Sequence, residues 1–440
     1  MRRHLLITFG LLVAAIAGAI LWFSIPDEAR LSVEAVSGAN PAITPPRPQW
    51  FPTMRVAAAK GWAPGAMPTP AAGLRVNAYA TGLVHPRWLY RLPNGDVLVA
   101  ETNAPPEKDS GSIKDWVADQ TMKKAGADVP SPNRITLLRD ADQDGVAEYR
   151  STLIAGLNSP FGMALLGGYL YIGDSDALVR VPFSVGRVHI TAKPEVVVKL
   201  PPGGHWARNV IVAPDGKSLF VTVGSSTNIA ENGIAAEFHR AAVWKVDPRA
   251  KTFSIYAEGL RNPNGLAFEP HSGQLWTTVN ERDMLGSDLA PDYMTHLEAG
   301  EHFGWPWYYW GGHQDLRVTP ANPALRARLT RPDFALGPHT AALGLTFAAE
   351  ARLGPAFANG AFVGEHGSWN RVPASGYKVV FIPFGTNGQP LKGGKPADVL
   401  TGFLDANGHA QGRPVGVTID RTGALLVADD VGNIVWRVSR

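Results

Sequence analysis

The fold is decided by residues 203–228, which read Gly-Gly-His-Trp-Ala-Arg-Asn-Val-Ile-Val-Ala-Pro-Asp-Gly-Lys-Ser-Leu-Phe-Val-Thr-Val-Gly-Ser-Ser-Thr-Asn. Apolar residues alternate with others before the Pro-Asp-Gly turn at 214–216 and again after it, which predicts a β-hairpin. Polar side chains stand at both open ends: His205 and Arg208 before the first strand, and Asn228 after the second. Because the two ends of a hairpin lie side by side, these groups are predicted to share one face of a sheet.

The same plan recurs along the chain. Further copies occupy residues 86–101, 160–174, 262–280, 342–365 and 414–429, and most add a third strand. Six such units predict an all-β fold, a six-bladed β-propeller. The alternative is a series of independent β-domains, which is disfavoured because units of three or four strands bury too little apolar surface to fold alone.

The composition suits this fold. The chain has 440 residues, of which 45% are hydrophobic and 18% charged, and its 47 glycines and 36 prolines fit a turn-rich β protein. A net charge of +3 gives no reason to expect nucleic acid as a partner. The absence of cysteine excludes disulfides, a covalently attached c-type haem and thiolate metal sites.

The N-terminal region predicts export. Arg2 and Arg3 precede an uncharged, apolar run over residues 5–25. A cleaved signal has an apolar region of about 7–15 residues, so the longer run favours an uncleaved membrane anchor over a signal peptide. The two arginines keep the N-terminus inside, which places the body in the periplasm or elsewhere outside the cytoplasmic membrane. Residues 1–36 are assigned to this segment, 37–73 to a Pro/Ala/Gly-rich tether, and 74–440 to the propeller.

Residues 105–132 interrupt the first blade. Ser112 to Asp115 resemble a capping box, with Ile113, Trp116, Val117 and Met122 on one side of the following turns and Gly126 as a stop. We expect a small helical insertion over one face of the propeller.

An acidic loop follows the insertion. Asp140, Asp142 and Asp144 occupy alternate positions, with Gly145 sixth and Glu148 ninth, as in the first half of a calcium loop. The twelfth position is Ser151, so the usual bidentate glutamate is missing. The loop is either a calcium site or a solvated acidic turn.

The residues just before each first strand and just after each second strand are predicted to border the mouth of the central channel. The first group comprises His85, Asn158, Ser159, His205, Arg208, Arg261, Asn262, His339 and Arg413, and the second Glu101, Asn103, Asp174, Asn228, Asn280, Glu281, Glu365, His366, Trp369, Asn370, Arg371, Asp429 and Asp430. Arginines in this number suggest a planar polyanionic ligand held by bidentate pairs. For any single arginine the alternative is a salt bridge that caps a blade, and for a single histidine it is a structural hydrogen bond.

Several segments resemble one known family. They are residues 203–210, beginning Gly-Gly-His-Trp; residues 258–268, containing Gly-Leu-Arg-Asn-Pro; residues 300–306, ending Gly-Trp-Pro; and residues 427–430 (Val-Ala-Asp-Asp), which come after residues 412–417. From residue 74 to residue 440 the chain resembles the soluble quinoprotein glucose/sorbosone dehydrogenases. The insertion around Trp116, the Asp140 loop and the segment from Glu365 to Arg371 are most similar to the sorbosone dehydrogenase branch.

The resemblance implies a propeller that binds pyrroloquinoline quinone (PQQ) with Ca²⁺ at the channel mouth. His205 would be the general base while hydride passes to the quinone, and Ca²⁺ on backbone carbonyls near Glu281 and Arg282 would polarise the receiving carbonyl. The cofactor-binding residues implied in this way are Arg208, Arg261 (also expected to act in catalysis), Asn262, Asn280, Arg371 and Arg413. This chain departs from the glucose enzymes in carrying Asn280-Glu281-Arg282 where they have a Gln-Gly-Pro-type turn.

The implied activity is the oxidation of an aldose or a sugar aldehyde, with electrons passed to an external acceptor such as a cytochrome or a quinone. Two other classes stay open. A calcium-dependent, lactonase-like hydrolase would use Glu101, Asn228 and Asp429 as metal ligands, and a non-catalytic binding propeller would need neither His205 nor the arginines.

Overall fold

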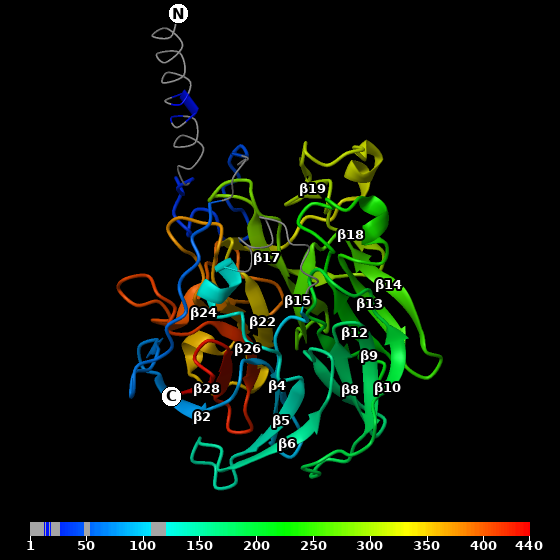
Figure 1. Cartoon of the computed structure of the whole chain (residues 1–440), viewed down its shortest axis with the longest axis vertical. Coiled ribbons are helices and arrows are strands. Elements are labelled where there is room, and N and C mark those ends of the chain that lie inside the picture. The colour runs from blue at the N-terminus through cyan, green and yellow to red at the C-terminus, as the bar shows by residue number, and fades with distance from the viewer. Residues whose placement is uncertain (1–12, 14, 17, 19–26, 48–52, 107–119) are drawn as a thin grey trace, which may run out of the picture.

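The computed structural model describes residues 13, 15–16, 18, 27–47, 53–106 and 120–440. In this part of the chain six sheets of four or five strands are arranged around a common centre, as Figure 1 shows. The predicted six-bladed β-propeller is therefore confirmed. In each blade the chain runs from the channel outward, and the open ends of the hairpins gather at one end of the channel, called here the mouth. The opposite end, where the chain turns within each hairpin, is called the turn face.

The strands of the blades have the following bounds. Blade 1 comprises β3 (Pro86–Arg91), β4 (Val97–Glu101), β5 (Arg134–Arg139) and β6 (Tyr149–Ala155); blade 2 comprises β7 (Met163–Leu166), β8 (Tyr169–Asp174), β9 (Ala177–Pro182) and β10 (Glu195–Lys199); blade 3 comprises β11 (Val210–Val212), β12 (Leu219–Val223), β13 (Ala242–Asp247), β14 (Thr252–Glu258) and β18 (Glu301–His302). Blade 4 comprises β15 (Asn262–Phe268), β16 (Leu275–Asn280), β17 (Pro291–Leu297) and β21 (Phe334–Pro338); blade 5 comprises β22 (Ala342–Phe347), β23 (Gly360–Glu365), β24 (Lys378–Pro383), β25 (Ala397–Thr401) and β1 (Thr69–Pro70); blade 6 comprises β26 (Pro414–Ile419), β27 (Leu425–Asp429), β28 (Ile434–Ser439) and β2 (Arg75–Ala80).

Short elements connect the blades. β19 (Tyr308–Tyr309) pairs with β20 (His313–Gln314) in the long connection of blade 4, and 3-10 turns occur at η1 (Ile234–Glu237), η2 (Pro323–Arg328), η3 (Ala348–Glu350) and η4 (Pro355–Phe357).

The hairpin of β11 and β12 has the predicted register. Val210 pairs with Val221 and Val212 with Leu219, so the alternating valines and leucines enter the packing between blades. Asp215 stabilises the turn, because its Oδ1 accepts the backbone N–H groups of Lys217 and Ser218, both at 2.8 Å.

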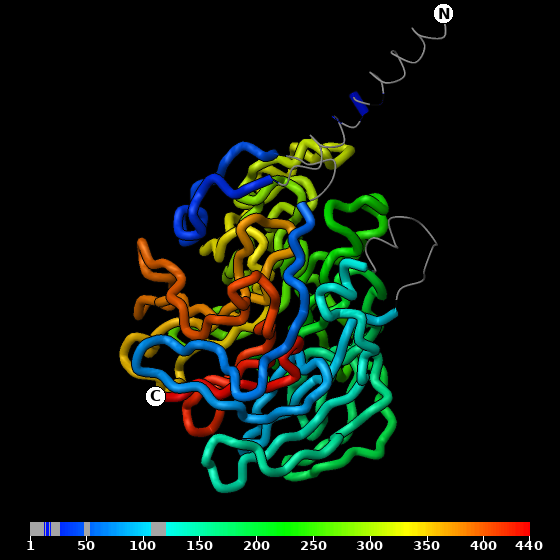
Figure 2. Tube along the Cα trace, turned by 60° about the vertical axis from the view of Figure 1, so that its left-hand side comes forward, coloured from blue at the N-terminus to red at the C-terminus, as the bar shows by residue number. Residues whose placement is uncertain are grey.

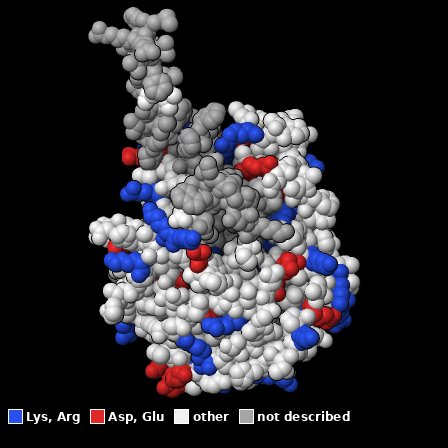
Figure 3. All heavy atoms as spheres, viewed as in Figure 1, with Lys and Arg blue, Asp and Glu red and all other residues white. Residues whose placement is uncertain are grey.

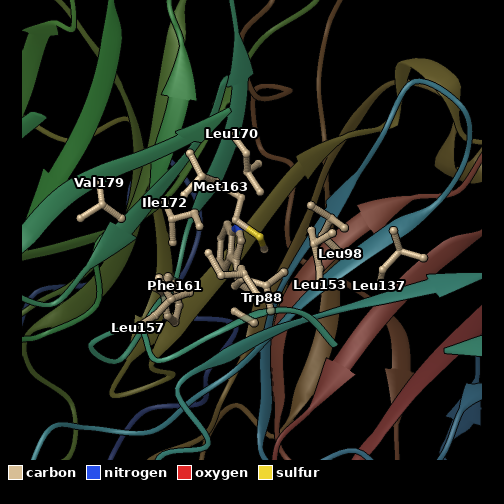
Figure 4. Close-up of a cluster of buried hydrophobic side chains, with 14 of the residues drawn as sticks. Trp88, Leu98, Leu137, Leu153, Leu157, Phe161, Met163, Leu170, Ile172 and Val179 are labelled. Carbon is tan, nitrogen blue, oxygen red and sulfur yellow. The ribbon is translucent and has the colours of Figure 1, made fainter. Parts of the chain in front are cut away.

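Neighbouring blades pack through large apolar side chains. Between blades 1 and 2, Trp88 and Phe161 lie with ring centroids 4.9 Å apart, and Met163, Leu98 and Ile172 fill the space around them (Figure 4). Burial of this kind stabilises the fold by about 25 cal/mol per Å² of apolar surface. A single blade cannot bury these faces alone, whereas the closed ring of blades buries them against one another.

Two strands from the N-terminal side complete the outer edges of the last two blades. β2 pairs antiparallel with β28, Val76 opposite Val438 and Ala78 opposite Trp436. β1 pairs with β25 in the same way. The ring is thus closed between segments from opposite ends of the sequence.

Most of the segment expected as a tether lies against the propeller. The backbone N–H of Gly38 donates to Ala335 O at 2.8 Å, that of Lys60 to Ala410 O at 2.8 Å, and the indole of Trp62 to Asp429 at 2.7 Å. Nearly all of the apolar run at 5–25 lies outside the described residues. Among the residues that are described, no helix is long and apolar enough to cross a membrane.

The insertion in blade 1 is described from residue 120 onward; Ile113, Trp116 and Val117 lie outside the described residues. Residues 120–125 are helical and end at Gly126, with φ +77°. The N–H of Gly126 donates to Lys123 O and that of Ala127 to Met122 O, the paired bonds of a Schellman cap, so the predicted stop is confirmed.

The surface shown in Figure 3 carries both signs of charge. Lys and Arg are interspersed with Asp and Glu on this face, in keeping with the net charge of +3.

Candidate active site

Blades 3 and 4 bring three of the predicted mouth residues together. Gly224, at the end of β12, lies so close to them that a methyl group placed on it would stand 2.5 Å from the Cβ of His205 and 2.6 Å from Oδ1 of Asn262. The next residue, Ser225, donates its backbone N–H to Arg261 O at 2.8 Å. His205, Arg261 and Asn262 therefore lie next to one another at the mouth.

The imidazole of His205 has a fixed tautomer. Its Nδ1 lies 3.0 Å from Ser225 O, and since a carbonyl oxygen only accepts, Nδ1 carries the proton. Burial, together with the positive charge of Arg261, lowers the pKa of His205 to about 3. Nε2 has no hydrogen-bond partner within the described residues. The ring is thus neutral, with Nε2 available to accept a proton.

Arg261 is held by five hydrogen bonds to neighbouring loops. Its guanidinium donates to the backbone oxygen of Asn228 (3.3 Å) and to its side-chain oxygen (3.0 Å), to Asn280 O (3.4 Å), to Glu281 O (2.8 Å) and to Asp283 Oδ2 (3.0 Å). All five N–H groups of the guanidinium are used in this way. Arg261 therefore brings positive charge to the site and fixes the surrounding loops, while its hydrogen bonds go to the protein.

Asp283 joins Arg261 to His339. Burial disfavours the Asp283 carboxylate, but the charges of Arg261 and His339 outweigh this and lower its pKa. His339 places Nδ1 3.1 Å from Asp283 Oδ1 and Nε2 3.1 Å from Gly286 O, so both nitrogens donate and the ring is charged. Burial opposes that charge, yet the bond to Asp283 raises the pKa of His339 above its ordinary value.

The two predicted asparagines differ in their surroundings. Asn262 is buried and its Oδ1 has no hydrogen-bond partner among the described residues. Asn280 donates from Nδ2 to Ala342 O at 2.5 Å, which ties blade 4 to blade 5. Asn262 therefore offers a buried, unpartnered oxygen, whereas the amide nitrogen of Asn280 is engaged by the protein.

The carbonyl predicted to hold calcium is already occupied. Nη1 of Arg261 lies 2.8 Å from Glu281 O, and a guanidinium there repels a divalent cation. The side chain of Arg282 forms a buried ion pair with Asp315. Glu281 is itself buried, and burial raises its pKa to about 8, so it is uncharged at neutral pH. These residues do not fit a calcium ion at the position that the resemblance implied.

Arg208 and Arg371 lie at the mouth, but their guanidinium groups donate hydrogen bonds to backbone oxygens. Arg208 donates to Pro201 O at 2.8 Å, to Ala207 O at 3.2 Å and to His205 O, and so shapes the loop that carries the imidazole. Arg371 donates to Ser287 O at 3.0 Å and Pro373 O at 2.7 Å. Both were expected to bind the cofactor; these hydrogen bonds position loops, and the buried Nε of Arg208 has no partner among the described residues.

Arg413 belongs to a second cluster, on blades 1, 5 and 6. Its guanidinium lies 5.0 Å from the ring centroid of Tyr377 and donates to Ala57 O at 3.3 Å, while its buried Nε has no partner. Arg87, which sequence reasoning missed, also has a buried Nε without a partner. Arg87 lies 5.8 Å from the ring of Trp206, the residue after His205, which connects the two clusters.

Asp430 is the counter-charge of this second cluster. Its Oδ2 accepts from Arg87 at 2.6 Å and lies 2.9 Å from Nε2 of His366 and 3.8 Å from Nε2 of His85. Burial opposes the carboxylate, but His366, Arg87 and His85 lower its pKa far below the ordinary value. One carboxylate thus forms an ion pair with Arg87, whereas the Arg413 guanidinium has no carboxylate partner among the described residues, so the cluster retains capacity for further anionic groups.

The Asp140 loop lies on the turn face, away from the mouth. One oxygen of each of Asp140, Asp142, Asp144 and Glu148 lies within 4.8 Å of the others. Asp140 Oδ1 is buried without a partner, and Gly145 takes φ +94° as the loop requires. Ser151 donates to Val188 O at 2.9 Å, so the ninth-position Glu148 closes the group in place of the twelfth residue.

Two residues escaped sequence reasoning because their chain positions looked ordinary. Arg87 occupies an inner-strand position in Pro-Arg-Trp, where a charged residue among apolar neighbours was the available signal. Asp283 follows the Asn280-Glu281-Arg282 turn by one position, and only the fold places it beside Arg261.

Two family models match the part of the chain that carries most of the mouth residues. Residues 173–368 match the family model described as glucose / sorbosone dehydrogenase, and residues 312–440 match one described as TrAA12-like. An uncharacterized protein of Borreliella burgdorferi is 27% identical over 65% of this chain and 77% of its own length. A pyrroloquinoline quinone-dependent pyranose dehydrogenase of Coprinopsis cinerea is 34% identical over 26% of this chain and 17% of its own length.

Solved structures share the fold. The PQQ domain of the Coprinopsis cinerea pyranose dehydrogenase, in its holo form, aligns over 88% of this chain and 100% of its own with a TM-score of 0.66 and 21% identity. The calcium structure of a Trichoderma reesei carbohydrate-active enzyme of family AA12 aligns over 88% and 98% with a TM-score of 0.68 and 18% identity.

Proposed function

We propose that this chain, whose residues 173–368 match the glucose / sorbosone dehydrogenase family model, oxidises an aldose or a sugar aldehyde with PQQ as electron acceptor. The observation that carries this proposal is the pairing of a neutral His205, whose Nε2 is unpartnered, with two arginines whose buried N–H groups also lack partners. A base near arginines that retain unpartnered N–H groups suits a reaction in which a hydroxyl loses its proton beside an anionic cofactor.

The residues at the mouth fit such a cofactor. PQQ is planar and carries three carboxylates, and Arg87 and Arg413 offer the charge and the free N–H groups to hold them. Asn262 adds a buried polar side chain, and its close approach to His205 requires glycine at position 224. When bound, the quinone takes up the two electrons of the oxidation.

His205 supplies the base. The bond from Nδ1 to Ser225 O orients the ring and leaves the Nε2 lone pair free, and the low pKa keeps that lone pair unprotonated at neutral pH. The hydroxyl at the carbon being oxidised loses its proton to Nε2. Arg261 stabilises the negative charge that develops on the substrate oxygen through its field, with no direct contact required.

A calcium-dependent hydrolase is disfavoured because the oxygens expected to bind its calcium already accept hydrogen bonds from the protein. Glu101 accepts from Arg134 and Thr136, Asp429 accepts the indole N–H groups of Trp62 and Trp436, and Asn228 Oδ1 accepts from Arg261. Each oxygen set that would bind the metal is engaged by protein donors. The reconstitution experiment described below distinguishes a dehydrogenase from a propeller that only binds its ligand.

Calcium is proposed for the Asp140 loop, as a structural ion on the turn face. Four acidic side chains converge there and one of their buried oxygens lacks a donor. The proposal for location is an extracytoplasmic protein held to the membrane by residues 5–25.

The test is reconstitution. Purified protein is incubated with PQQ, with and without Ca²⁺, and reduction of an artificial dye is followed with aldoses and with sugar aldehydes such as sorbosone. The expected result is sugar-dependent bleaching that requires PQQ. Tight PQQ binding without turnover of any sugar would favour a binding protein, and absence of PQQ binding would overturn the proposal.

A further inference from the structure

The segment after the apolar run is fastened directly to the channel mouth. The backbone N–H of Ser287 donates to Asp27 Oδ2 and its hydroxyl donates to Asp27 O, both at 2.6 Å. The Asp27 N–H in turn donates to Thr53 Oγ1 at 2.9 Å. Ser287 belongs to the loop that begins at Asp283, the partner of Arg261, so this contact lies at the edge of the candidate site.

Asp288 strengthens the attachment. Its fully buried carboxylate accepts from the backbone of Arg30 at 2.9 Å and from that of Leu31 at 3.3 Å, and forms an ion pair with Arg47 at 2.8 Å. A buried carboxylate with three donors is costly to separate from them, because it would be left charged and unpaired. The segment is therefore held at defined positions on the mouth.

A second set of contacts extends the attachment around the mouth. The N–H of Ala29 donates to Val372 O at 2.7 Å, that of Arg55 to Trp369 O at 2.8 Å, and the side chain of Asn370 to Thr53 O at 3.0 Å. The N-terminal segment, dark blue, lies at the same end of the molecule in both views (Figures 1 and 2).

We infer that the mouth of the propeller faces the membrane surface at close range, with lipid head groups as the partner of this face. The inference rests on the anchor in the proposed function. The uncharged run ends at Ile25, and two residues extend at most about 7 Å, so Asp27 cannot lie farther than this from the end of the anchor. Since Asp27 is hydrogen-bonded to Ser287, only a few ångströms of chain connect the end of the anchor to the mouth.

The surface around the attachment suits this orientation. Arg30 and Arg55 are exposed there, together with one exposed carboxylate at Glu28, and cations next to a membrane anchor favour anionic head groups. Met54, between the two anchored residues Thr53 and Arg55, is 41% exposed. The turn face lies a strand length away, about 17–23 Å for five to seven residues. Substrate and electron acceptor then reach the site along the membrane surface.

The experiment uses the absence of cysteine. Full-length Met54→Cys and Val185→Cys each carry one thiol, at positions 41% and 44% exposed, the first at the mouth and the second in the turn-face loop after β9. Each variant is labelled with the same fluorophore and reconstituted into vesicles whose head groups carry a short-range quencher. The label at position 54 is expected to be quenched severalfold more than the label at position 185.

Equal quenching at the two positions, or none at either, would overturn the inference, as would purification from membranes of a form that begins at or after Asp27. Arg47→Ala, which removes the ion pair to Asp288, is expected to reduce the difference between the labels. Dye-linked activity with PQQ is measured on the same detergent-solubilised proteins. Loss of that activity with the quenching difference intact would count against the proposed reaction and leave the orientation standing.

Discussion

Nδ1 of His205 donates to the carbonyl oxygen of Ser225 at 3.0 Å, and the backbone N–H of the same histidine donates to that oxygen as well, also at 3.0 Å. The approach is possible because the preceding residue is Gly204: a methyl group there would lie 2.6 Å from Ser225 O, and its φ is +65°. Two glycines, Gly204 and Gly224, therefore let the loop and the strand close around one imidazole.

His205→Gln removes the proposed base. Turnover is expected to fall by about 10²–10⁴, the usual contribution of a positioned base, whereas PQQ affinity should change little because the imidazole is uncharged. Steady-state dye reduction and PQQ titration measure the two effects.

His189→Gln is the matched control for this variant. His189 is exposed and its Nδ1 lies 3.0 Å from the backbone oxygen of Thr152, so the same kind of hydrogen bond is lost away from the mouth. It should keep wild-type turnover. Unchanged turnover in His205→Gln that still binds PQQ would show that another group is the base.

Arg413→Ala tests the second cluster. A desolvated, charge-assisted hydrogen bond is worth about 1.5–3 kcal/mol, so PQQ should bind about 10- to 150-fold more weakly, with turnover at saturating PQQ much less affected. Equilibrium titration gives the affinity, and a melting curve separates this effect from loss of fold. Arg421→Ala, an exposed arginine on the turn face, should leave affinity unchanged. Equal affinities in all three proteins would remove Arg413 from the cofactor site.

Glu365 makes stability depend on pH. The side chain is 1% exposed, its Oε2 has no partner, and burial raises its pKa to about 8. The folded protein thus keeps this proton up to about pH 8, whereas the unfolded chain releases it near pH 4.5. Since the folded state binds more protons between these values, the free energy of unfolding falls as pH rises through that window.

Glu365→Gln cannot ionise and should abolish this contribution. Relative to wild type, the free energy of unfolding of the variant is expected to be higher by about 3–5 kcal/mol at pH 8 and little changed at pH 4.5. Denaturant unfolding at both pH values measures the difference. Glu350→Gln, which changes an exposed glutamate, should alter the free energy of unfolding little at either pH. A gain that is the same at both pH values would mean that packing, and not ionisation, is responsible.

Chelation tests the Asp140 loop. A ligand at 100 times its Kd stabilises the folded state by about 2.7 kcal/mol, so EDTA should lower the Tm of the wild type by several degrees and Ca²⁺ should restore it. The Asp142→Asn/Asp144→Asn pair lacks two of the four converging charges and should melt at the same temperature with either addition. A wild-type Tm indifferent to Ca²⁺ would identify the loop as a solvated acidic turn.

The hairpins were predictable because alternation and turn residues are local signals. Val210 to Val223 and Pro414 to Asp429 pair as their patterns indicated. The convergence of His205, Arg261 and Asn262 followed from the propeller, since equivalent ends of the blades meet at one mouth.

Contacts made by backbone groups were not predictable in the same way. Arg208 and Arg371 look like ligand-binding arginines in the sequence, but carbonyl oxygens, which every residue carries, take their N–H groups. The attachment of Asp27 to Ser287 joins positions 260 residues apart, and nothing in the sequence around either residue indicates the other as its partner. Only the folded arrangement supplies such information.

The pairing of β2 with β28 has a consequence for how the protein is made. Arg75, at the start of β2, donates to Arg440 O at 2.8 Å, across 365 residues. During synthesis β2 must wait, with its backbone unpaired, until β28 has left the ribosome, and an unpaired strand edge invites association with other chains. The ring therefore closes only after the last strand of the chain has been synthesised.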